Sequence, residues 1–313
     1  MVGEITNVYR IMYIRCNMNN ENYTINRRHH SILILLLFIG IIPSAFAQRL
    51  PYTFNQIRIA DNSLENRIYC MLKDQSGYLW LGTASGLKRY DSELTITLKR
   101  QKNNPNSLVD NNVLALCEDR QGRIWVGTSE GVCYFDKQKN SFVTLKELNK
   151  PDYVCFNIIC DSRGDIWFTI RDRGLFKFDT RTNQLQNFRH SEINKQTISS
   201  NRIIQNGLIE APDKKGLWIL CNNDFGLNYL DFSSRKIFNR GYNPPKIPVF
   251  EVQVPTALTI NQNKLVFADN TKHQIVWYDT PSKKITKSFQ LEGEWATFLK
   301  WQNYFLMSIR IFG

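Results

Sequence analysis

The sequence predicts an all-β fold, a β-propeller built from four-stranded antiparallel blades. A motif that begins Asp-x-x-Gly and continues through Trp to Gly-Thr recurs along the chain, and its first four tryptophans are separated by 45, 42 and 51 residues. Within each repeat, short runs of β-branched and aromatic residues alternate with turn-forming residues. A repeat of this length, with one glycine and aromatic motif per unit, is typical of a propeller blade.

The motif is nearly complete in its first two copies, Asp74–Asp91 and Asp119–Asp136. Both follow the pattern D-x-x-G-x-[LI]-W-[LV]-G-T-x-x-G-[LV]-x-x-[YF]-D. We align the remaining, weaker copies as Asp161–Asp179, Asp213–Asp231, Asn261–Asp279 and a start at Trp301.

Each part of the motif has a physical reading as a strand or a turn. In Asp-x-x-Gly, the Asp side chain can accept hydrogen bonds from the backbone ahead of it and the Gly accepts a positive φ, so a tight turn is expected. We therefore interpret the repeated Asp and Gly as turn residues. The repeated Trp could be a stacking platform for a sugar, but one Trp at the same place in every repeat favours a wedge packed between blades.

The repeat spacing also predicts how the chain is divided. Seven blades of about 45 residues would need about 315 residues, so we expect an incomplete seven-bladed ring with five to six blades present. Phe54–Ile59 has the pattern of a lone outer strand. The expected parts are a leader and signal peptide at 1–47 and a propeller at 48–313, with blades near 66–108, 109–150, 151–198, 199–250 and 251–295 and a partial sixth at 296–313.

The N-terminal segment predicts export. Arg27 and Arg28 precede an apolar run from Ile32 to Ile42, and Ala45-Phe46-Ala47 follows. A basic flank, a short apolar run and an A-x-A site are the parts of a secretory signal, and the run is shorter than the ~20 residues of a membrane-spanning helix. We expect cleavage after Ala47; an uncleaved anchor or a buried helix is the alternative.

The charge balance gives a weak indication of the ligand. The formal net charge is +12, and removal of residues 1–47 leaves 36 basic and 26 acidic residues, a net charge of +10. A basic surface can suit nucleic acid, anionic lipid or an acidic glycan. Because export is predicted, we expect no nucleic-acid partner and favour an acidic ligand.

The residues needed for catalysis or metal binding are scarce. Only His190 and His273 lie after residue 47, both in polar segments where solvated side chains are expected, and no zinc-ligand, nucleotide or hydrolase motif is present. We predict no catalytic residues, no metal site and no cofactor. Six cysteines follow the leader at positions that do not match between repeats, so we expect mostly buried thiols, with one incidental disulfide as the alternative.

The repeats resemble the two-component regulator propeller family, the periplasmic sensor region of hybrid two-component systems of Bacteroidetes. The motif described above carries the resemblance, together with the linker Asn104–Val113 and its echo Thr197–Ile203, and it covers roughly residues 52–240. It implies a periplasmic sensor whose full-length relatives hold further propeller blades, a membrane helix and a histidine kinase. Those later parts are not visible in this sequence, so the resemblance implies a fragment that binds but does not transmit.

Strand connectivity predicts where a ligand binds. The turns between first and second strands lie on one face of the propeller, and the loops between second and third strands, with the linkers between blades, lie on the other. This second face carries Arg and Asn side chains, which suit sugar hydroxyls and carboxylates. The candidate ligand-binding residues are Arg67, Asn112, Arg171, Arg173, Asn201, Arg202, Asn222 and Asn223.

Three functions remain open. The first is a periplasmic ligand-sensing module. Its expected ligand is an oligosaccharide or another small ligand, acidic ones included, and its expected protein partners are the remaining receptor domains or a homodimer partner. The second is a propeller lyase or hydrolase of the streptogramin-lyase type, which would need a cluster of His and carboxylate groups. The third is a protein-interaction scaffold.

Overall fold

The computed structural model describes residues 67–222, 226–252 and 255–292. The predicted leader and signal peptide, the lone strand Phe54–Ile59, the partial sixth blade and Asn223 lie outside these described residues. Ile59–Gly313 forms one compact unit, which contains all the described strands. In the described residues no helix has the length and apolar character needed to span a bilayer.

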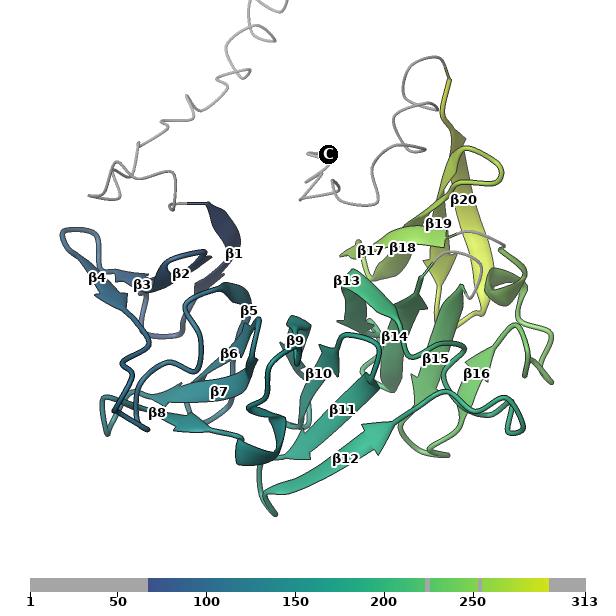
Figure 1. Cartoon of the computed structure of the whole chain (residues 1–313). Coiled ribbons are helices and arrows are strands. Elements are labelled where there is room, and N and C mark those ends of the chain that lie inside the picture. The colour runs from purple at the N-terminus through teal and green to yellow at the C-terminus, as the bar shows by residue number, and fades with distance from the viewer. Residues whose placement is uncertain (1–66, 223–225, 253–254, 293–313) are drawn as a thin grey trace, which may run out of the picture. The chain divides into compact units, whose positions relative to one another are not determined.

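The described strands form five four-stranded antiparallel sheets, and in each sheet the strands pair in chain order (Figure 1). The first blade holds β1 (Ile68–Lys73), β2 (Leu79–Thr83), β3 (Gly86–Tyr90) and β4 (Thr95–Leu98). The second holds β5 (Val113–Glu118), β6 (Ile124–Thr128), β7 (Gly131–Asp136) and β8 (Ser141–Thr144). The third holds β9 (Cys155–Cys160), β10 (Ile166–Ile170), β11 (Gly174–Asp179) and β12 (Gln184–Phe188).

The fourth blade holds β13 (Ile203–Glu210), β14 (Gly216–Cys221), β15 (Leu227–Asp231) and β16 (Ile237–Asn239). The fifth holds β17 (Pro255–Asn261), β18 (Lys264–Asp269), β19 (Gln274–Asp279) and β20 (Lys284–Gln290). Short 3₁₀ turns, η3 (Lys146–Leu148) and η5 (Pro248–Glu251), lie in the linkers after the second and fourth blades. The first strand of each blade contacts the first strand of the next, as in a propeller. The predicted fold class is therefore confirmed.

The repeated Trp is a wedge between blades, as predicted. Trp80, Trp125, Trp167 and Trp218 are at most 2% exposed. The aromatic residue of the following blade's third strand packs against the indole, with ring centroids 5.5 Å apart for Trp80–Phe135 and 5.1 Å apart for Trp125–Phe178. Aromatic pairs at this separation stabilise the interface beyond the area that they bury.

The repeated Asp holds both its own turn and the Trp. One oxygen of Asp74 accepts the backbone N–H of Tyr78, and the other accepts the indole N–H of Trp80 at 2.8 Å. The same indole bond measures 2.7 Å in the second copy and 2.9 Å in the third, where Asp161 is the acceptor. The predicted turn role is thus correct, and the bond to the Trp explains why this carboxylate is buried.

The Gly and Thr that follow the Trp set the spacing between blades. A Cβ atom on Gly127 would lie 2.6 Å from the Cys155 Sγ in the first strand of the next blade. The Thr128 hydroxyl donates to the Gly131 carbonyl at 2.9 Å and so closes the hairpin between β6 and β7. Only a residue without a side chain allows this approach of the two blades.

The fourth copy of the motif differs from our alignment of the sequence. Lys73 pairs with Leu79 in the first blade and Glu210 pairs with Leu217 in the fourth, so the structural counterpart of the repeated Asp is Ala211. The turn contains one extra residue. Asp213 is therefore not the equivalent of the Trp-binding Asp, and Lys214, with φ of 59°, takes the positive-φ position that Gly holds in the other turns.

The cysteines are free thiols among the described residues, as we favoured from their positions. Most are buried in the interfaces between blades. Burial raises the pKa of Cys70 to about 12 and that of Cys160 to about 11, so these thiols stay protonated at neutral pH. They act as small apolar residues of the core.

Candidate functional site

On the face that carries the Asp-x-x-Gly turns, an ion-paired lysine joins the first two blades. The Lys137 ammonium bridges Asp74 of the first blade, at 2.7 Å, and Glu118 of the second, at 2.8 Å. Burial alone would raise the pKa of Asp74, but hydrogen bonds from Lys137 and Trp80 outweigh it and hold the pKa below its ordinary value. This carboxylate is a structural group that is already fully partnered.

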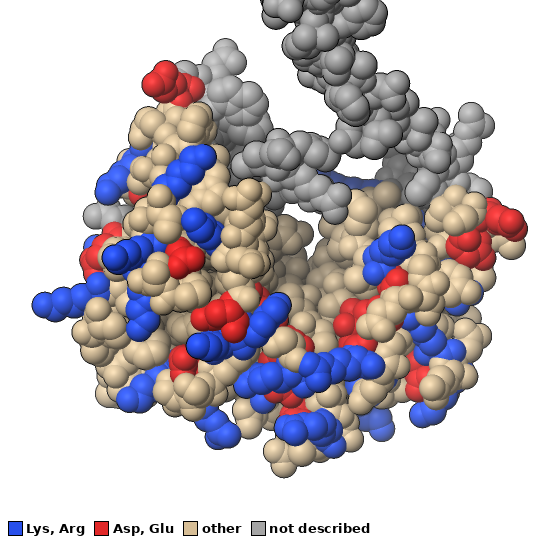
Figure 2. All heavy atoms as spheres, turned by 180° about the vertical axis from the view of Figure 1, so that it is seen from behind, with Lys and Arg blue, Asp and Glu red and all other residues tan. Residues whose placement is uncertain are grey.

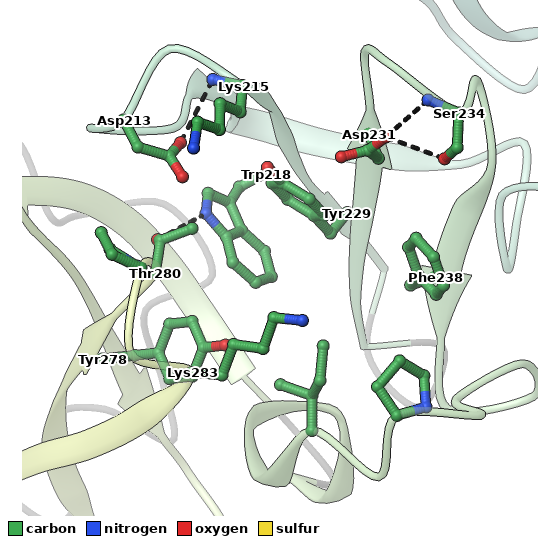
Figure 3. Close-up of a pocket in the computed structure, with 13 residues that line it drawn as sticks. Asp213, Lys215, Trp218, Tyr229, Asp231, Ser234, Phe238, Tyr278, Thr280 and Lys283 are labelled. Atoms are coloured by element: carbon green, nitrogen blue, oxygen red, sulfur yellow. Dashed lines mark hydrogen bonds between the residues drawn. The ribbon is translucent and has the colours of Figure 1, made fainter.

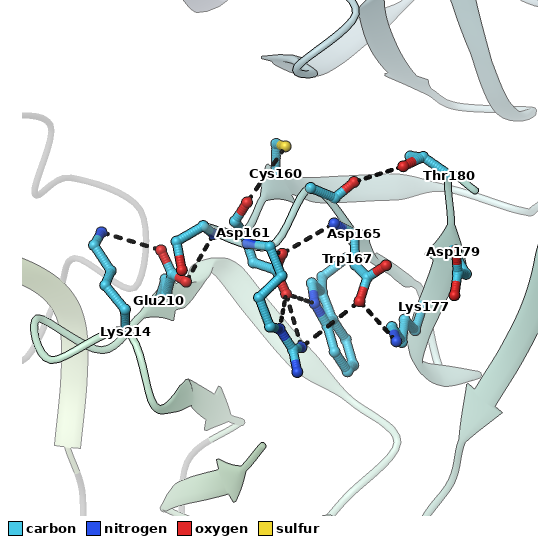
Figure 4. A network of polar contacts seen from close by, with 12 residues as sticks. Cys160, Asp161, Asp165, Trp167, Lys177, Asp179, Thr180, Glu210 and Lys214 are labelled. Carbon is cyan, nitrogen blue, oxygen red and sulfur yellow. Dashed lines mark hydrogen bonds and ion pairs between the residues drawn. The ribbon is translucent and has the colours of Figure 1, made fainter. Parts of the chain in front are cut away.

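In the third blade the ion pairs of these turns lie within the blade (Figure 4). Arg163 pairs with Asp161 at 2.9 Å, and Lys177 pairs with Asp165 at 2.7 Å. The Arg163 guanidinium also lies 3.4 Å from the ring centroid of Phe232 in the next blade. These partners leave little unpaired charge for a ligand at this junction.

The opposite face carries the loops between second and third strands. Arg171, Asp172 and Arg173 form the exposed loop between β10 and β11. The Arg171 N–H donates to the Val154 carbonyl at 2.9 Å, which ties this loop to the linker that leads into the blade. Asp172 takes a positive φ of 56°, so the two arginines leave the loop on either side of a sharp bend.

Both arginines lie over aromatic rings of the third blade. The Cζ of Arg171 is 4.9 Å from the ring centroid of Phe156, and the Cζ of Arg173 is 4.3 Å from that of Tyr153. The Lys150 ammonium lies 5.6 Å from the Tyr153 centroid. Cation–π contacts of this kind orient a cation while leaving its hydrogen-bond donors available.

A third arginine reaches this loop from the next blade. The Arg202 Nε lies 3.7 Å from an Asp172 oxygen, and these two side chains are 66% and 62% exposed. An ion pair at that distance and exposure is weak and can exchange for another anion. We call this group the loop cluster, and it consists of Lys150, Tyr153, Phe156, Arg171, Arg173 and Arg202.

The other predicted residues are placed differently. The side chains of Asn112 and Asn201 bond within the protein: Asn112 Nδ2 donates to Ser129 Oγ at 2.6 Å and Asn201 Oδ1 accepts the His190 N–H at 2.8 Å. The Asn222 backbone N–H donates to the Arg202 carbonyl. Arg67 is exposed at the start of the first blade, and its guanidinium lies over the ring of the nearby Tyr69.

The structure therefore brings together three of the predicted residues, Arg171, Arg173 and Arg202. It adds Lys150, Tyr153 and Phe156, which sequence reasoning missed. The signal for them was present, because Pro151-Asp-Tyr153 places an aromatic residue in a polar linker beside the strand that holds Phe156. Their pairing with the arginines depends on blade geometry and is not visible in the sequence.

The remaining surface does not form a continuous basic patch in the view of Figure 2. Basic and acidic side chains are interspersed over that face, although the formal net charge is +12. Within the described part of the chain, no group of three or more His, Cys, Asp or Glu residues could hold a metal ion. His190, expected to be solvated, is instead half-buried, and its Nδ1 pairs with the Ile198 carbonyl at 2.8 Å.

Comparison with known families identifies the repeat. The profile of the family described as "Two component regulator propeller" matches residues 62–85 and 107–130. These two segments are thus similar to two-component regulator propeller repeats. The matched segments contain the first two Asp-x-x-Gly turns, their tryptophans and the linker before the second blade. Comparison with curated proteins finds no significant match.

Solved structures with the same fold include extracellular domains from B. thetaiotaomicron. One belongs to a protein assigned as a hybrid two component system, with 19% identity and a TM-score of 0.56 over 75% of this chain and 32% of the other. Another, assigned as a one component system, has 17% identity and a TM-score of 0.56 over 73% of this chain and 31% of the other. The chain thus spans about a third of the length of these structures.

An enzyme also shares the fold. Virginiamycin B lyase from Staphylococcus aureus has 17% identity and a TM-score of 0.52, over 74% of this chain and 72% of the lyase. At this level of identity the likeness shows the propeller fold and carries no activity.

Proposed function

We propose that this chain is the ligand-binding propeller of a sensor that acts outside the cytoplasm in two-component signalling. The matched repeats and the extracellular domains with the same fold support the proposal. The predicted signal segment at 1–47 agrees with export to the periplasm. In such a receptor, ligand binding shifts the arrangement of domains that the rest of the receptor reads.

The ligand that we propose is an oligosaccharide with carboxylate groups. The observation that carries this is the loop cluster, where Arg171, Arg173 and Arg202 offer guanidinium groups beside the rings of Tyr153 and Phe156. A guanidinium can donate two parallel hydrogen bonds to a carboxylate. The adjacent rings give the apolar surface on which the ring of a sugar can lie.

Calorimetric titration with matched acidic and neutral oligosaccharides tests the proposal. The wild-type chain should bind a uronate-containing oligosaccharide more tightly than its neutral counterpart, and salt should weaken the binding. The double variant R171M/R173M should bind about tenfold or more weakly, because each charge-assisted hydrogen bond contributes about 1.5–3 kcal/mol.

Arg181 provides the control for this experiment. It is also highly exposed, with a 79% exposed side chain, but it lies in the turn between β11 and β12, away from the loop cluster. R181M should leave the affinity unchanged. Equal affinity of the wild type and the double variant would contradict the proposed site.

A lyase function is the second candidate, and its basis is the shared fold with virginiamycin B lyase. The lyase structure was determined with quinupristin. Incubation of the chain with this compound, followed by mass spectrometry, should leave it unchanged if the chain is a binding module. Cleavage of the compound would favour the enzyme instead.

A scaffold function would show as specific capture of a protein partner without binding of any oligosaccharide.

A further inference from the structure

A pocket lies where the repeat is broken, at the junction of the fourth and fifth blades (Figure 3). Its volume is about 380 Å³, within the range of small-molecule sites. It opens among the Asp-x-x-Gly turns and the turns between third and fourth strands, on the face opposite to the loop cluster. Its lining includes the side chains of Asp213, Trp218, Tyr229, Tyr278, Thr280 and Lys283.

In the first three blades two groups contact the repeated Trp, a buried Asp that accepts its indole N–H and a cation over its ring. Neither group is present at Trp218 among the described residues. In the first three blades the indole N–H donates to a buried Asp at 2.7–2.9 Å. In the fourth blade Ala211 occupies the position of that Asp. The indole N–H of Trp218 instead donates to the Thr280 hydroxyl of the next blade, at 3.4 Å. The longer bond indicates a looser closure of this junction.

The cation that covers the Trp ring is absent from the described residues of the fourth blade, although the second blade also has a tyrosine, Tyr134, paired with its Trp. Arg89, Arg123 and Lys177 lie 5.6–5.8 Å from the indole centroids in the first three blades. In the fourth blade Tyr229 pairs with Trp218 in the strand register, and no cation lies over the indole among the described residues. Gly216 leaves space for this ring, since a Cβ there would lie 2.6 Å from the Tyr229 hydroxyl.

The pocket has an apolar wall of aromatic rings. The rings of Tyr229 and Tyr278 lie 4.7 and 5.5 Å from that of Trp218. Phe238 extends the wall on the other side in Figure 3, and Ile247 also lines the pocket. A flat apolar group of a ligand would bury its surface there.

The polar groups of the pocket are divided between two ends. Figure 3 shows the Lys283 side chain extending across the pocket, and no ion-pair partner for it is present in the described part of the chain. At the other end lie Asp213, with Lys215 beside it, and the Tyr229 hydroxyl, whereas the Tyr278 hydroxyl points toward the Lys283 side chain in this view. Burial, together with the nearby Asp213 and Asp231, raises the pKa of Tyr229, so its hydroxyl stays protonated.

We propose that this pocket binds a small zwitterion with an apolar body, such as an aromatic amino acid. Lys283 pairs with the ligand carboxylate, Asp213 and the Tyr229 hydroxyl receive its ammonium group, and the aromatic wall holds its side chain. The pocket would give the propeller a second ligand on the face opposite to the loop cluster. The proposal does not depend on oligosaccharide binding, because the two sites share no residue.

Three molecules of similar shape test it by calorimetry on the full chain: phenylalanine, phenylacetate and phenylethylamine. Phenylalanine should bind about tenfold or more tightly than either singly charged analogue, because each analogue loses one charged contact. K283M should weaken phenylalanine binding by a similar factor. K284M, at the neighbouring exposed position in β20, is the matched control and should bind like the wild type.

The variant Y229F keeps the ring packing and removes only a hydroxyl. It should weaken phenylalanine binding and leave phenylacetate binding unchanged. No binding of phenylalanine, or equal binding of the three molecules, would overturn the proposal. The variant K283M should bind the oligosaccharide as the wild type does. A failure of phenylalanine binding would then contradict only the pocket proposal and not the loop cluster.

Discussion

Replacement of the buried Asp in the third blade tests the reading of the repeat most sharply. The Asp161 carboxylate accepts the indole N–H of Trp167, backbone N–H groups of its own turn and the guanidinium of Arg163. D161A removes all of these bonds and leaves a buried indole N–H without an acceptor. An unsatisfied buried donor alone costs about 1–3 kcal/mol.

We expect D161A to lower the free energy of unfolding by about 3 kcal/mol, because loss of the turn bonds adds to the cost of the unpaired indole. D213A is the matched comparison. Asp213 occupies the corresponding place in the sequence motif, but in the described residues its carboxylate accepts a hydrogen bond from its own turn, the Lys215 N–H, and none from an indole. Its removal should cost about 0.5 kcal/mol or less, as for most surface substitutions.

Urea unfolding of the two variants, followed by tryptophan fluorescence and circular dichroism, measures both free energies. A large loss for D161A with a small loss for D213A is the expected result. Similar losses for the two variants would refute the structural alignment that places Ala211, not Asp213, at the Trp-binding position.

Three further predictions follow from the same contacts. G127V should lower the melting temperature, because its side chain would overlap Cys155 of the next blade; an unchanged temperature would contradict the close approach of these blades. Asp74 and Asp161 have pKa values below the ordinary one near 4, so their contribution to stability is complete above that pH and is lost as pH falls through the lowered values. Urea midpoints that do not fall on acidification in this range would refute that assignment. A thiol reagent should label the native chain slowly and the unfolded chain rapidly, because burial raises the pKa of thiols such as Cys133 and Cys221; fast labelling of the native chain would place these thiols at the surface.

The propeller was predictable because the same short motif provides both the turn within a blade and the Trp that packs between blades. Asp74, Gly77 and Trp80 each have one role in a turn or a wedge, and the same roles recur in the next two copies. Repetition at a fixed spacing makes such roles visible in a single sequence. The fourth copy was misaligned because one extra residue in its turn moves Asp213 into an apparent match with the motif.

The candidate site was only partly predictable. Arg171 and Arg173 could be placed on the face of the loops between second and third strands, because antiparallel connectivity fixes the side on which a loop lies. Their contacts with Phe156 and Tyr153 depend on the distance between a loop and a linker, which no spacing in the sequence encodes. Asn112 and Asn201 were chosen for their hydrogen-bonding capacity, and the structure uses both within the protein.

Hydrogen exchange in the presence of a uronate-containing oligosaccharide tests the central claim, that the propeller binds its ligand through the loop cluster. We expect slower exchange of backbone amides at 150–156 and 171–173, with no change in the Asp-x-x-Gly turns on the opposite face. Protection confined to those turns, or no protection at all while the oligosaccharide is bound, would contradict it.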